Sequence, residues 1–221
     1  MLAPAAEDTV RMDTDYSLYL VTDPALPAGR SMVDIVAAAI RGGVSCVQLR
    51  EKDTPGGRFC GIAEQLLAVT RPAGIPLIIN DRVDVMLATD ADGVHVGQSD
   101  IPAERVRRLI GPHRILGVSV EAAEEVAPAI AAGADYLGAS PVFPTPTKAD
   151  TGRPLLFEGL RRICHASTVP VVAIGGMNHQ NAAEAIAAGA AGIAVVRAIM
   201  AAEDPRAAAQ QLREIIDRAN G

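Results

Sequence analysis

The sequence lacks several features that mark particular classes of protein. It has no tryptophan, and aromatic residues make up only 3% of its 221 residues, although 49% are hydrophobic. Alanine, valine and isoleucine therefore have to fill most of the core. There is also no excess of positive charge: the formal net charge of −6 argues against a general binder of nucleic acids or membrane surfaces. A phosphate site would have to be a local cluster of basic residues.

Cysteine is scarce and long apolar runs are missing. Cys46, Cys60 and Cys164 are scattered without a CxxC pair, so we expect reduced thiols. The longest apolar stretch, 187–196, is far shorter than the roughly 18 residues of a membrane span. The chain does not begin with basic residues followed by an apolar segment, so we expect no signal peptide and a cytoplasmic location.

Short β-branched runs alternate with segments of helical spacing along most of the chain. The expected strands are 17–22, 46–50, 77–80, 93–96, 115–120, 136–139, 170–174 and 192–196. The expected helices are 31–42, 57–71, 82–89, 102–110, 121–132, 155–166, 179–188 and 204–219. This alternation predicts an α/β protein with a single (β/α)8 TIM barrel over residues 16–221, preceded by an N-terminal arm of residues 1–15. An open doubly wound sheet is the alternative, but no GxGxxG follows the first strand.

Polar residues gather where the expected strands end, which is where barrels of this kind carry their active sites. Gln48, Arg50 and Lys52 alternate with apolar residues at the end of the second strand, so the three share the face toward the barrel mouth. Two cations there either clamp an anion or belong to a rim ion pair of the Arg50–Glu51 type.

Two carboxylates follow the next two strands. Asp81 comes directly after the third strand, and Asp100 lies four residues beyond the fourth. Each could cap the helix that follows it. Together on one rim, opposite two cations, they form the arrangement that holds Mg²⁺ on a pyrophosphate. The sequence therefore predicts a first anion site, with a metal, over strands two to four.

A second anion site, without a metal, is expected over strands six to eight. Segment 140–148 contains three prolines, two threonines and a lysine, and glycines 175–176 follow strand seven. Helix starts after strands seven and eight, including 196–197, offer backbone N–H groups to phosphate oxygens. Ser119, at the end of strand five, is either a hydrogen-bond donor or a helix cap. The four histidines, His95 among them, have no metal-ligand spacing, so we expect structural or surface roles for them.

Eight segments spread over residues 17–200 resemble the thiamine-phosphate synthase family. They are YLVTD (19–23), QLREK (48–52), IIND (78–81), GVHVGQSD (93–100), GVSV (117–120), GASPVFPTPTK (138–148), IGGMN (174–178) and GIAVV (192–196). The resemblance implies a transferase of thiamine biosynthesis. Such an enzyme joins 4-amino-5-hydroxymethyl-2-methylpyrimidine diphosphate to a thiazole phosphate, which gives thiamine monophosphate and pyrophosphate.

The resemblance also implies roles for individual residues. The pyrimidine diphosphate would be held by Gln48, Leu49, Arg50, Glu51, Lys52 and Asn80, with Ser119 and Lys148 on the diphosphate side and Asp81 and Asp100 as Mg²⁺ ligands. The thiazole phosphate would be received by Thr145, Pro146, Thr147, Gly176, Val196 and Arg197. Arg50, Lys52, Lys148 and Ser119 would act catalytically by neutralising charge on the leaving pyrophosphate. No general base is required, because the attacking nitrogen carries no proton.

One residue departs from the family pattern, which commonly has a small residue, often serine, at the position of Arg197. Its guanidinium either contacts the phosphate or points to solvent and leaves the contact to the backbone N–H. The resemblance further suggests a homodimer that handles two small phosphorylated substrates and no nucleic acid or membrane.

Two other functions compete with the synthase. One is a thiazole tautomerase on a similar barrel, which has no use for a diphosphate and Mg²⁺ set. The other is a non-catalytic sensor of phosphorylated ligands, which would have lost charged residues at the mouth. The chain keeps the full set, so the synthase is expected.

Overall fold

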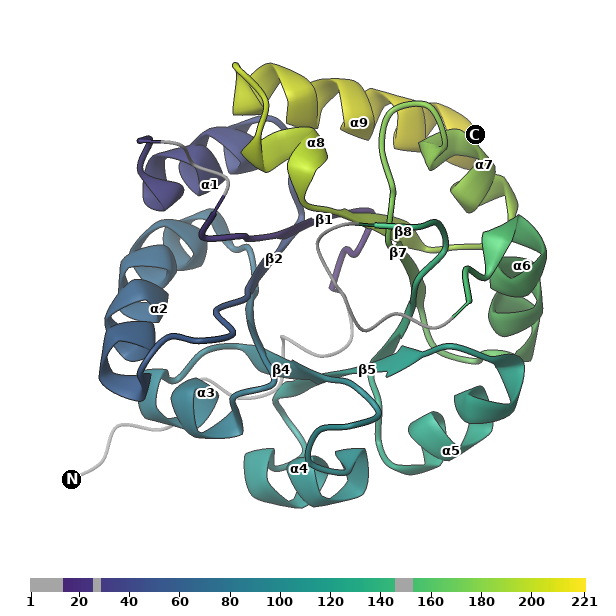
Figure 1. The fold of residues 1–221 in the computed structure, drawn as a ribbon, viewed down its shortest axis with the longest axis horizontal. Coiled ribbons are helices and arrows are strands. Elements are labelled where there is room, and N and C mark those ends of the chain that lie inside the picture. The colour runs from purple at the N-terminus through teal and green to yellow at the C-terminus, as the bar shows by residue number, and fades with distance from the viewer. Residues whose placement is uncertain (1–13, 26–28, 146–152) are drawn as a thin grey trace.

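Eight parallel strands close into a barrel in sequence order, with β8 paired to β1 (Figure 1). The structure is a computed structural model that describes residues 14–25, 29–145 and 153–221. The strands are β1 (Leu18–Val21), β2 (Cys46–Leu49), β3 (Leu77–Asn80), β4 (Gly93–Val96), β5 (Ile115–Val120), β6 (Tyr136–Ala139), β7 (Val171–Ile174) and β8 (Gly192–Val195). The predicted (β/α)8 barrel is confirmed, and no strand end differs from its predicted position by more than one residue.

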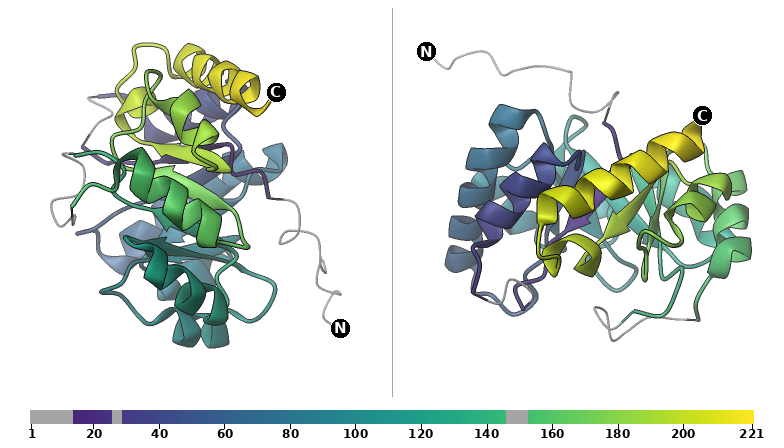
Figure 2. Two further views of the ribbon diagram at one scale, coloured as in Figure 1. Left: turned by 90° about the vertical axis from the view of Figure 1, so that its right-hand side faces the viewer. Right: turned by 90° about the horizontal axis from the view of Figure 1, so that it is seen from above.

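Helices surround the barrel on the outside (Figure 1). They are α1 (Met32–Arg41), α2 (Gly56–Thr70), α3 (Val83–Thr89), α4 (Ala103–Ile110), α5 (Val126–Ala131), α6 (Leu156–Ala166), α7 (Ala182–Ala187), α8 (Arg197–Met200) and α9 (Pro205–Asn220), with short 3-10 turns η1 (Arg71–Ala73) and η2 (Ala123–Glu125). The C-terminal helix α9 lies along the outside of the barrel and packs against α1 and α7 (Figure 2). No helix within the described ranges is long and apolar enough to cross a membrane.

Three helical segments differ from the sequence prediction, one of them only because α7 begins at Ala182, three residues after its predicted start. The segment 121–132 is divided into η2 and α5 because Pro128 cannot donate a backbone hydrogen bond within a continuous helix. In α5 it occupies the first turn, where no N–H partner is needed. The four-residue helix α8 was not predicted, and it begins directly after β8 at the mouth of the barrel. The predicted arm falls almost wholly outside the described residues, so the division at residue 15 stays a prediction.

Alternation along the strands separates two apolar clusters. Leu20, Val47 and Ile79 belong to the larger cluster, which fills the space between the barrel and its helices. Tyr19 and Tyr136 belong to the smaller cluster inside the barrel. The third tyrosine of the chain also belongs to it, so every tyrosine in a chain poor in aromatics serves the barrel interior.

Charged residues form hydrogen bonds at the end of the barrel where the strands begin. Asp135 precedes β6 and accepts hydrogen bonds from Arg107 Nη2 at 2.6 Å and from the N–H of Leu116 at 2.8 Å. Arg107 also donates to the carbonyl oxygens of Gly133 and Gly111. These contacts tie α4 to the strand starts and satisfy polar groups that would otherwise be costly to bury.

Candidate active site

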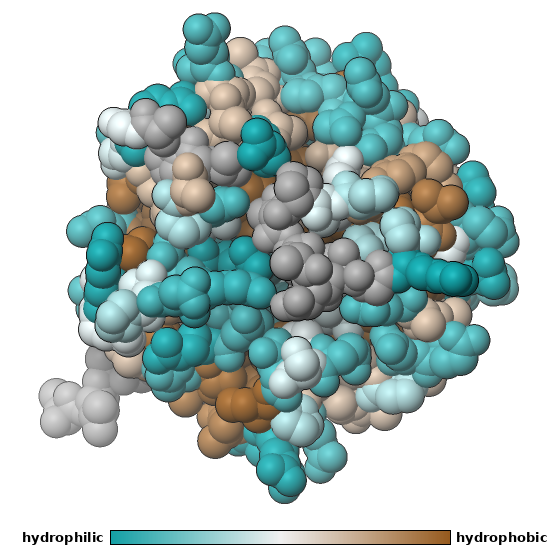
Figure 3. All heavy atoms as spheres, in the orientation of Figure 1, coloured by the Kyte–Doolittle hydropathy of each residue, from teal (hydrophilic) through white to brown (hydrophobic). Residues whose placement is uncertain are grey.

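A cavity of about 780 Å³ opens at the carboxyl ends of the strands. On the face that Figure 3 shows, hydrophilic residues gather beside the middle of the molecule. The predicted site residues that line the cavity are Gln48, Arg50, Lys52, Asn80, Asp81, Asp100, Ser119, Thr145, Gly176, Val196 and Arg197. The fold therefore brings residues from both predicted anion sites to one opening.

The other predicted site residues fall into two groups. Pro146, Thr147 and Lys148 lie outside the described residues, so their roles stay predictions. Leu49 is fully buried in the cluster between barrel and helices, so only its backbone could reach a ligand. Glu51 is buried too and does not line the cavity formed by the described ranges; its Oε2 accepts a hydrogen bond from Thr54 Oγ1 at 2.6 Å.

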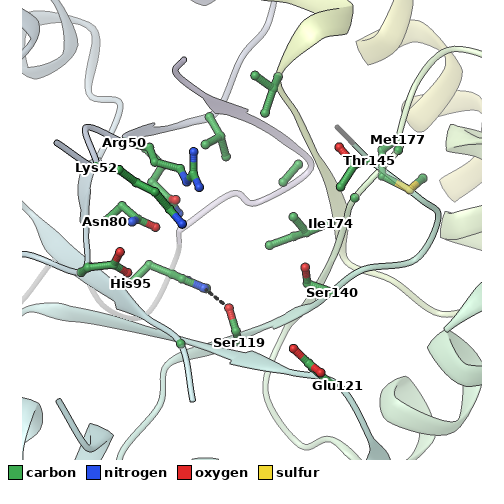
Figure 4. A pocket seen from close by; sticks show the side chains of 18 of the residues that line it. Arg50, Lys52, Asn80, His95, Ser119, Glu121, Ser140, Thr145, Ile174 and Met177 are labelled. Atoms are coloured by element: carbon green, nitrogen blue, oxygen red, sulfur yellow. Dashed lines mark hydrogen bonds between the residues drawn. The ribbon is translucent and has the colours of Figure 1, made fainter. Parts of the chain in front are cut away.

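The cationic wall comes from β2 and the loop that follows it. The side chains of Arg50 and Lys52 point into the cavity beside Asn80 (Figure 4). The N–H of Arg50 donates to Thr22 Oγ1 at 3.1 Å, which holds this strand end against β1. Within the described ranges neither cation forms a direct ion pair, so the alternative of a rim pair with Glu51 is not realised. Both charges remain available to an anion in the cavity.

Asp81 and Asp100 lie close enough to perturb each other. Burial, and next the charge of the Asp100 carboxylate, raise the pKa of Asp81 to about 6, although Arg50 and Lys52 act in the opposite direction. Asp81 also has a left-handed backbone (φ 61°), a conformation that a residue other than glycine rarely adopts. Backbone strain beside two facing carboxylates indicates a site that is organised for a ligand.

Neither aspartate caps the helix that follows it. The N-cap positions of α3 and α4 are Arg82 and Pro102, and neither makes a side-chain capping bond. Asp100 Oδ2 instead accepts a hydrogen bond from the N–H of Gly97 at 2.7 Å. The capping alternative considered for both residues is therefore wrong, and their carboxylates need another explanation.

The donor set suits Mg²⁺ better than a metal that is held entirely by protein. Among the described residues no group of three or more His, Cys, Asp or Glu side chains could surround an ion. Mg²⁺ is commonly bound through one or two carboxylates, with waters and substrate phosphate oxygens completing its coordination. The carboxylates of Asp81 and Asp100 repel each other, and a divalent cation bound between them would relieve this repulsion.

The opposite wall is formed by the loops after β6, β7 and β8. Gly175 and Gly176 have positive φ values of 98° and 66°, and a Cβ at Gly176 would stand 2.7 Å from Phe143 Cβ. The carbonyl oxygen of Gly176 accepts hydrogen bonds from Asn178 Nδ2 at 3.1 Å and Asn181 Nδ2 at 3.0 Å. These contacts hold the glycine backbone at the cavity in one conformation.

Helix α8 begins at the same wall. Val196 is its N-cap residue, and Val196, Arg197 and Ala198 all line the cavity. The leading N–H groups of a helix have no partner within the helix. The side chain of Arg197 is exposed, so the contact with a bound group can come from the backbone, the side chain or both.

Ser119 belongs to a hydrogen-bond network rather than to a helix cap. Its Oγ lies 2.9 Å from His95 Nε2, and His95 Nδ1 lies 2.8 Å from the hydroxyl of Tyr136. His95 itself lines the cavity (Figure 4). The sequence prediction gave His95 only a structural or surface role, because its spacing from the other histidines does not suit a metal site. The signal was its place between Val94 and Val96, which point to the helices, so that His95 had to point inward.

Comparisons with known proteins agree with these observations. The family described as thiamine monophosphate synthase matches residues 18–199. A thiamine-phosphate synthase of Roseiflexus sp. is 51% identical over 199 residues, which are 90% of this chain and 84% of that protein. Another thiamine-phosphate synthase, of Albidiferax ferrireducens, is 54% identical over 200 residues, which are 90% of this chain and 91% of that protein. The solved structure of a thiamine phosphate pyrophosphorylase from Pyrococcus furiosus is 42% identical with a TM-score of 0.86, and covers 94% of this chain and 98% of that one.

Proposed function

The chain belongs to the thiamine monophosphate synthase family, and from this premise we infer its reaction. It condenses 4-amino-5-hydroxymethyl-2-methylpyrimidine diphosphate with a thiazole phosphate, and the products are thiamine monophosphate and pyrophosphate. We propose that both substrates meet in the cavity at the barrel mouth. The observation that carries this proposal is that one wall offers two cations and a carboxylate pair, while the opposite wall offers backbone N–H groups.

The diphosphate belongs at the wall formed by β2, β3 and β4. Arg50 and Lys52 would neutralise its oxygens there, and Asn80 would add a hydrogen bond. Asp81 and Asp100 would hold Mg²⁺, whose role when bound is to neutralise charge on the diphosphate. Lys148 is proposed to join this wall from a segment outside the described residues.

The thiazole phosphate belongs at the opposite wall. The backbone at Gly176 and the first N–H groups of α8 would donate to its oxygens. Thr145, which lines the cavity, would add a hydroxyl, and Pro146 and Thr147 are proposed to complete the pocket. This arrangement places each anion against a different set of donors, so the two substrates do not compete for one site.

The chemistry needs charge neutralisation more than proton transfer. The bond between the pyrimidine methylene carbon and the diphosphate oxygen breaks, and its electron pair leaves with pyrophosphate. The lone pair of the thiazole nitrogen forms the new C–N bond, so no proton has to be removed. Arg50, Lys52 and the Ser119 hydroxyl face the region where negative charge grows, and donors placed in advance at such a region lower the barrier.

Pyrophosphate release by the purified protein tests the proposal. Release should require both substrates and a divalent cation, and thiamine monophosphate should appear in equal amount. A thiazole tautomerase would instead convert the thiazole phosphate without the pyrimidine diphosphate. A sensor would bind the ligands without turnover, and either result would contradict the synthase.

Two broader expectations are part of the same proposal. We propose a homodimer that works in the cytoplasm on its two small phosphorylated substrates. Light scattering on the purified protein would measure the oligomeric state, and a monomer at all concentrations would contradict the dimer.

A further inference from the structure

Five polar side chains form a continuous hydrogen-bonded chain through the barrel interior. Gln48 Nε2 donates to the Tyr19 hydroxyl at 3.0 Å, and that hydroxyl lies 2.9 Å from the hydroxyl of Tyr136. The chain continues through His95 to Ser119 over the two short contacts described above. Gln48, His95 and Ser119 line the cavity, whereas the two tyrosines are fully buried beneath it. The chain therefore leaves the cavity at one wall and returns to it at another.

Close backbone approach at two glycines makes room for this chain. A Cβ at Gly117 would collide with the Tyr136 ring and with His95 Nδ1. A Cβ at Gly138 would stand 2.7 Å from Ile174 Cδ1 and 3.0 Å from His95 Cε1. Since both glycines lie within strands, where a larger side chain would ordinarily pack better, their absence of a side chain serves the network.

One proton order makes every hydrogen bond of this chain point in the same direction. In this order Gln48 Nε2 donates to the Tyr19 hydroxyl, Tyr19 donates to Tyr136, and Tyr136 donates to His95 Nδ1; the positions of the heavy atoms allow either direction in the last two contacts. In a neutral imidazole that accepts at Nδ1, the proton is on Nε2 and is donated to Ser119 Oγ. Burial raises the pKa of both phenols well above the ordinary value, so both keep the hydrogens on which this order depends.

We propose that His95 and Tyr136 are positioning residues that hold the hydroxyl of Ser119 with its hydrogen turned toward the cavity. Ser119 Oγ accepts from His95, so its hydrogen is available to an oxygen of the leaving diphosphate. At the other end Gln48 donates inward through Nε2, so its Oε1 can accept from the amino group of the pyrimidine. This inference rests on the proposed function, because it takes the leaving diphosphate as the group that the hydroxyl meets.

As a consequence, the hydrogen bond that Gln48 makes at one wall of the cavity is coupled to the one that Ser119 makes at the other. If Gln48 turned its amide over, every hydrogen bond in the chain would reverse, and Ser119 would then donate to His95 instead of to the substrate. A ligand that accepts a hydrogen bond from Gln48, rather than donating one, would favour the reversed order. Recognition of the amino group at Gln48 is thereby linked to the donor at Ser119, which is 71 residues away in the sequence.

Nitrogen NMR of the ligand-free protein tests the proton order without any turnover. With ¹⁵N-labelled histidine, the His95 ring should be neutral and protonated at Nε2, and the spectrum of His95→Gln assigns its signals. In Tyr136→Phe the preference for that tautomer should weaken, because the donor to Nδ1 is lost. A His95 ring protonated at Nδ1 in the wild-type protein would overturn the proposal.

Kinetics of Tyr136→Phe test the consequence for the reaction. The variant should lose about tenfold in kcat, the value of roughly one well-placed hydrogen bond, with KM for the pyrimidine diphosphate within about twofold of wild type. In a Ser119→Ala background the same change should cost nothing further. Tyr16→Phe is the matched control. The centroids of the Tyr16 and Tyr136 rings are 4.6 Å apart, but the Tyr16 hydroxyl interacts with Thr14, which is not part of the hydrogen-bonded chain. Equal losses in Tyr136→Phe and Tyr16→Phe, or full additivity with Ser119→Ala, would overturn the positioning role.

Two replacements of His95 separate its two contacts. Glutamine can place an amide near the former Nε2 and donate to Ser119, whereas asparagine can reach only toward Tyr136. We expect His95→Gln to keep most of kcat and His95→Asn to fall to the level of Ser119→Ala; the reverse order would contradict the proposal. If the wild-type protein released no pyrophosphate at all, the proposed function would fail, while the tautomer of His95 would still decide the proton order.

Discussion

The two ends of the barrel differ in whether their charged side chains form ion pairs within the protein. Where the strands begin, two carboxylates form ion pairs: Asp135 with Arg107, and Asp90 with Arg71 and Arg114. Where the strands end, Arg50 and Lys52 form no direct ion pair within the described ranges, and two aspartates face each other. Charges that are paired within the protein stabilise the fold, whereas charges left unpaired at the mouth favour a ligand that completes them.

Removing either aspartate at the mouth should give the largest effect. Asp81→Ala and Asp100→Ala should each lower kcat at least roughly 100-fold while the protein stays folded, because loss of a Mg²⁺ ligand removes charge neutralisation on the diphosphate. Turnover assays beside circular dichroism measure both quantities. Full activity of both variants, or of wild type in EDTA, would remove the metal from the proposal.

A substitution at the opposite end should affect stability instead. Asp135→Ala leaves the Arg107 guanidinium without its carboxylate, and the side chains of this pair are only 16% (Arg107) and 8% (Asp135) exposed. We expect a loss of about 2 kcal/mol in the free energy of unfolding, between the values for exposed and buried pairs, with kcat per folded molecule unchanged. Urea denaturation checks the first number. A fall in kcat at full stability would contradict the division of roles between the two ends.

The carboxylate pair should make stability depend on pH in a way that Mg²⁺ reverses. The pKa of Asp81 is raised in the folded protein, so the folded state binds more protons and its advantage is lost as pH rises toward about 6. Without metal, Asp81→Asn should therefore exceed wild type by on the order of 1 kcal/mol at neutral pH, and by less near pH 4. Thermal unfolding of wild type and Asp81→Asn at both pH values, in EDTA and in Mg²⁺, measures the difference in stability between the two proteins under each condition. Equal stabilities at both pH values would argue against repulsion in the pair.

The smallest effect is expected at Arg197. We expect Arg197→Ser to bind the thiazole phosphate almost as wild type does, because the backbone at Gly176 and the first N–H groups of α8 are proposed to bind the phosphate without the guanidinium. Calorimetric titration of the two proteins measures the difference. A loss above about 1.5 kcal/mol would show that the guanidinium itself contacts the phosphate.

Local signals in the sequence were sufficient for the barrel and for most of its mouth. Alternation along β2 placed Gln48 and Arg50 toward the mouth, since side-chain direction in a strand has a period of two. The same rule applied to His95 would have placed it inside the barrel. Helix α8 was missed because four residues are too few to show a helical period.

The sequence by itself determined the closed barrel, the order of its strands and the polar residues at their ends, because these follow from short-range patterns. Only the tertiary structure decided what those residues do together. Asp81 has a left-handed backbone and its carboxylate interacts with that of Asp100, and no pattern in the sequence reports either feature. Likewise Gln48 and Ser119 are joined through Tyr19, Tyr136 and His95 only because closure of the sheet brings five strands around one interior. Contacts between residues so far apart in the chain depend on the whole fold.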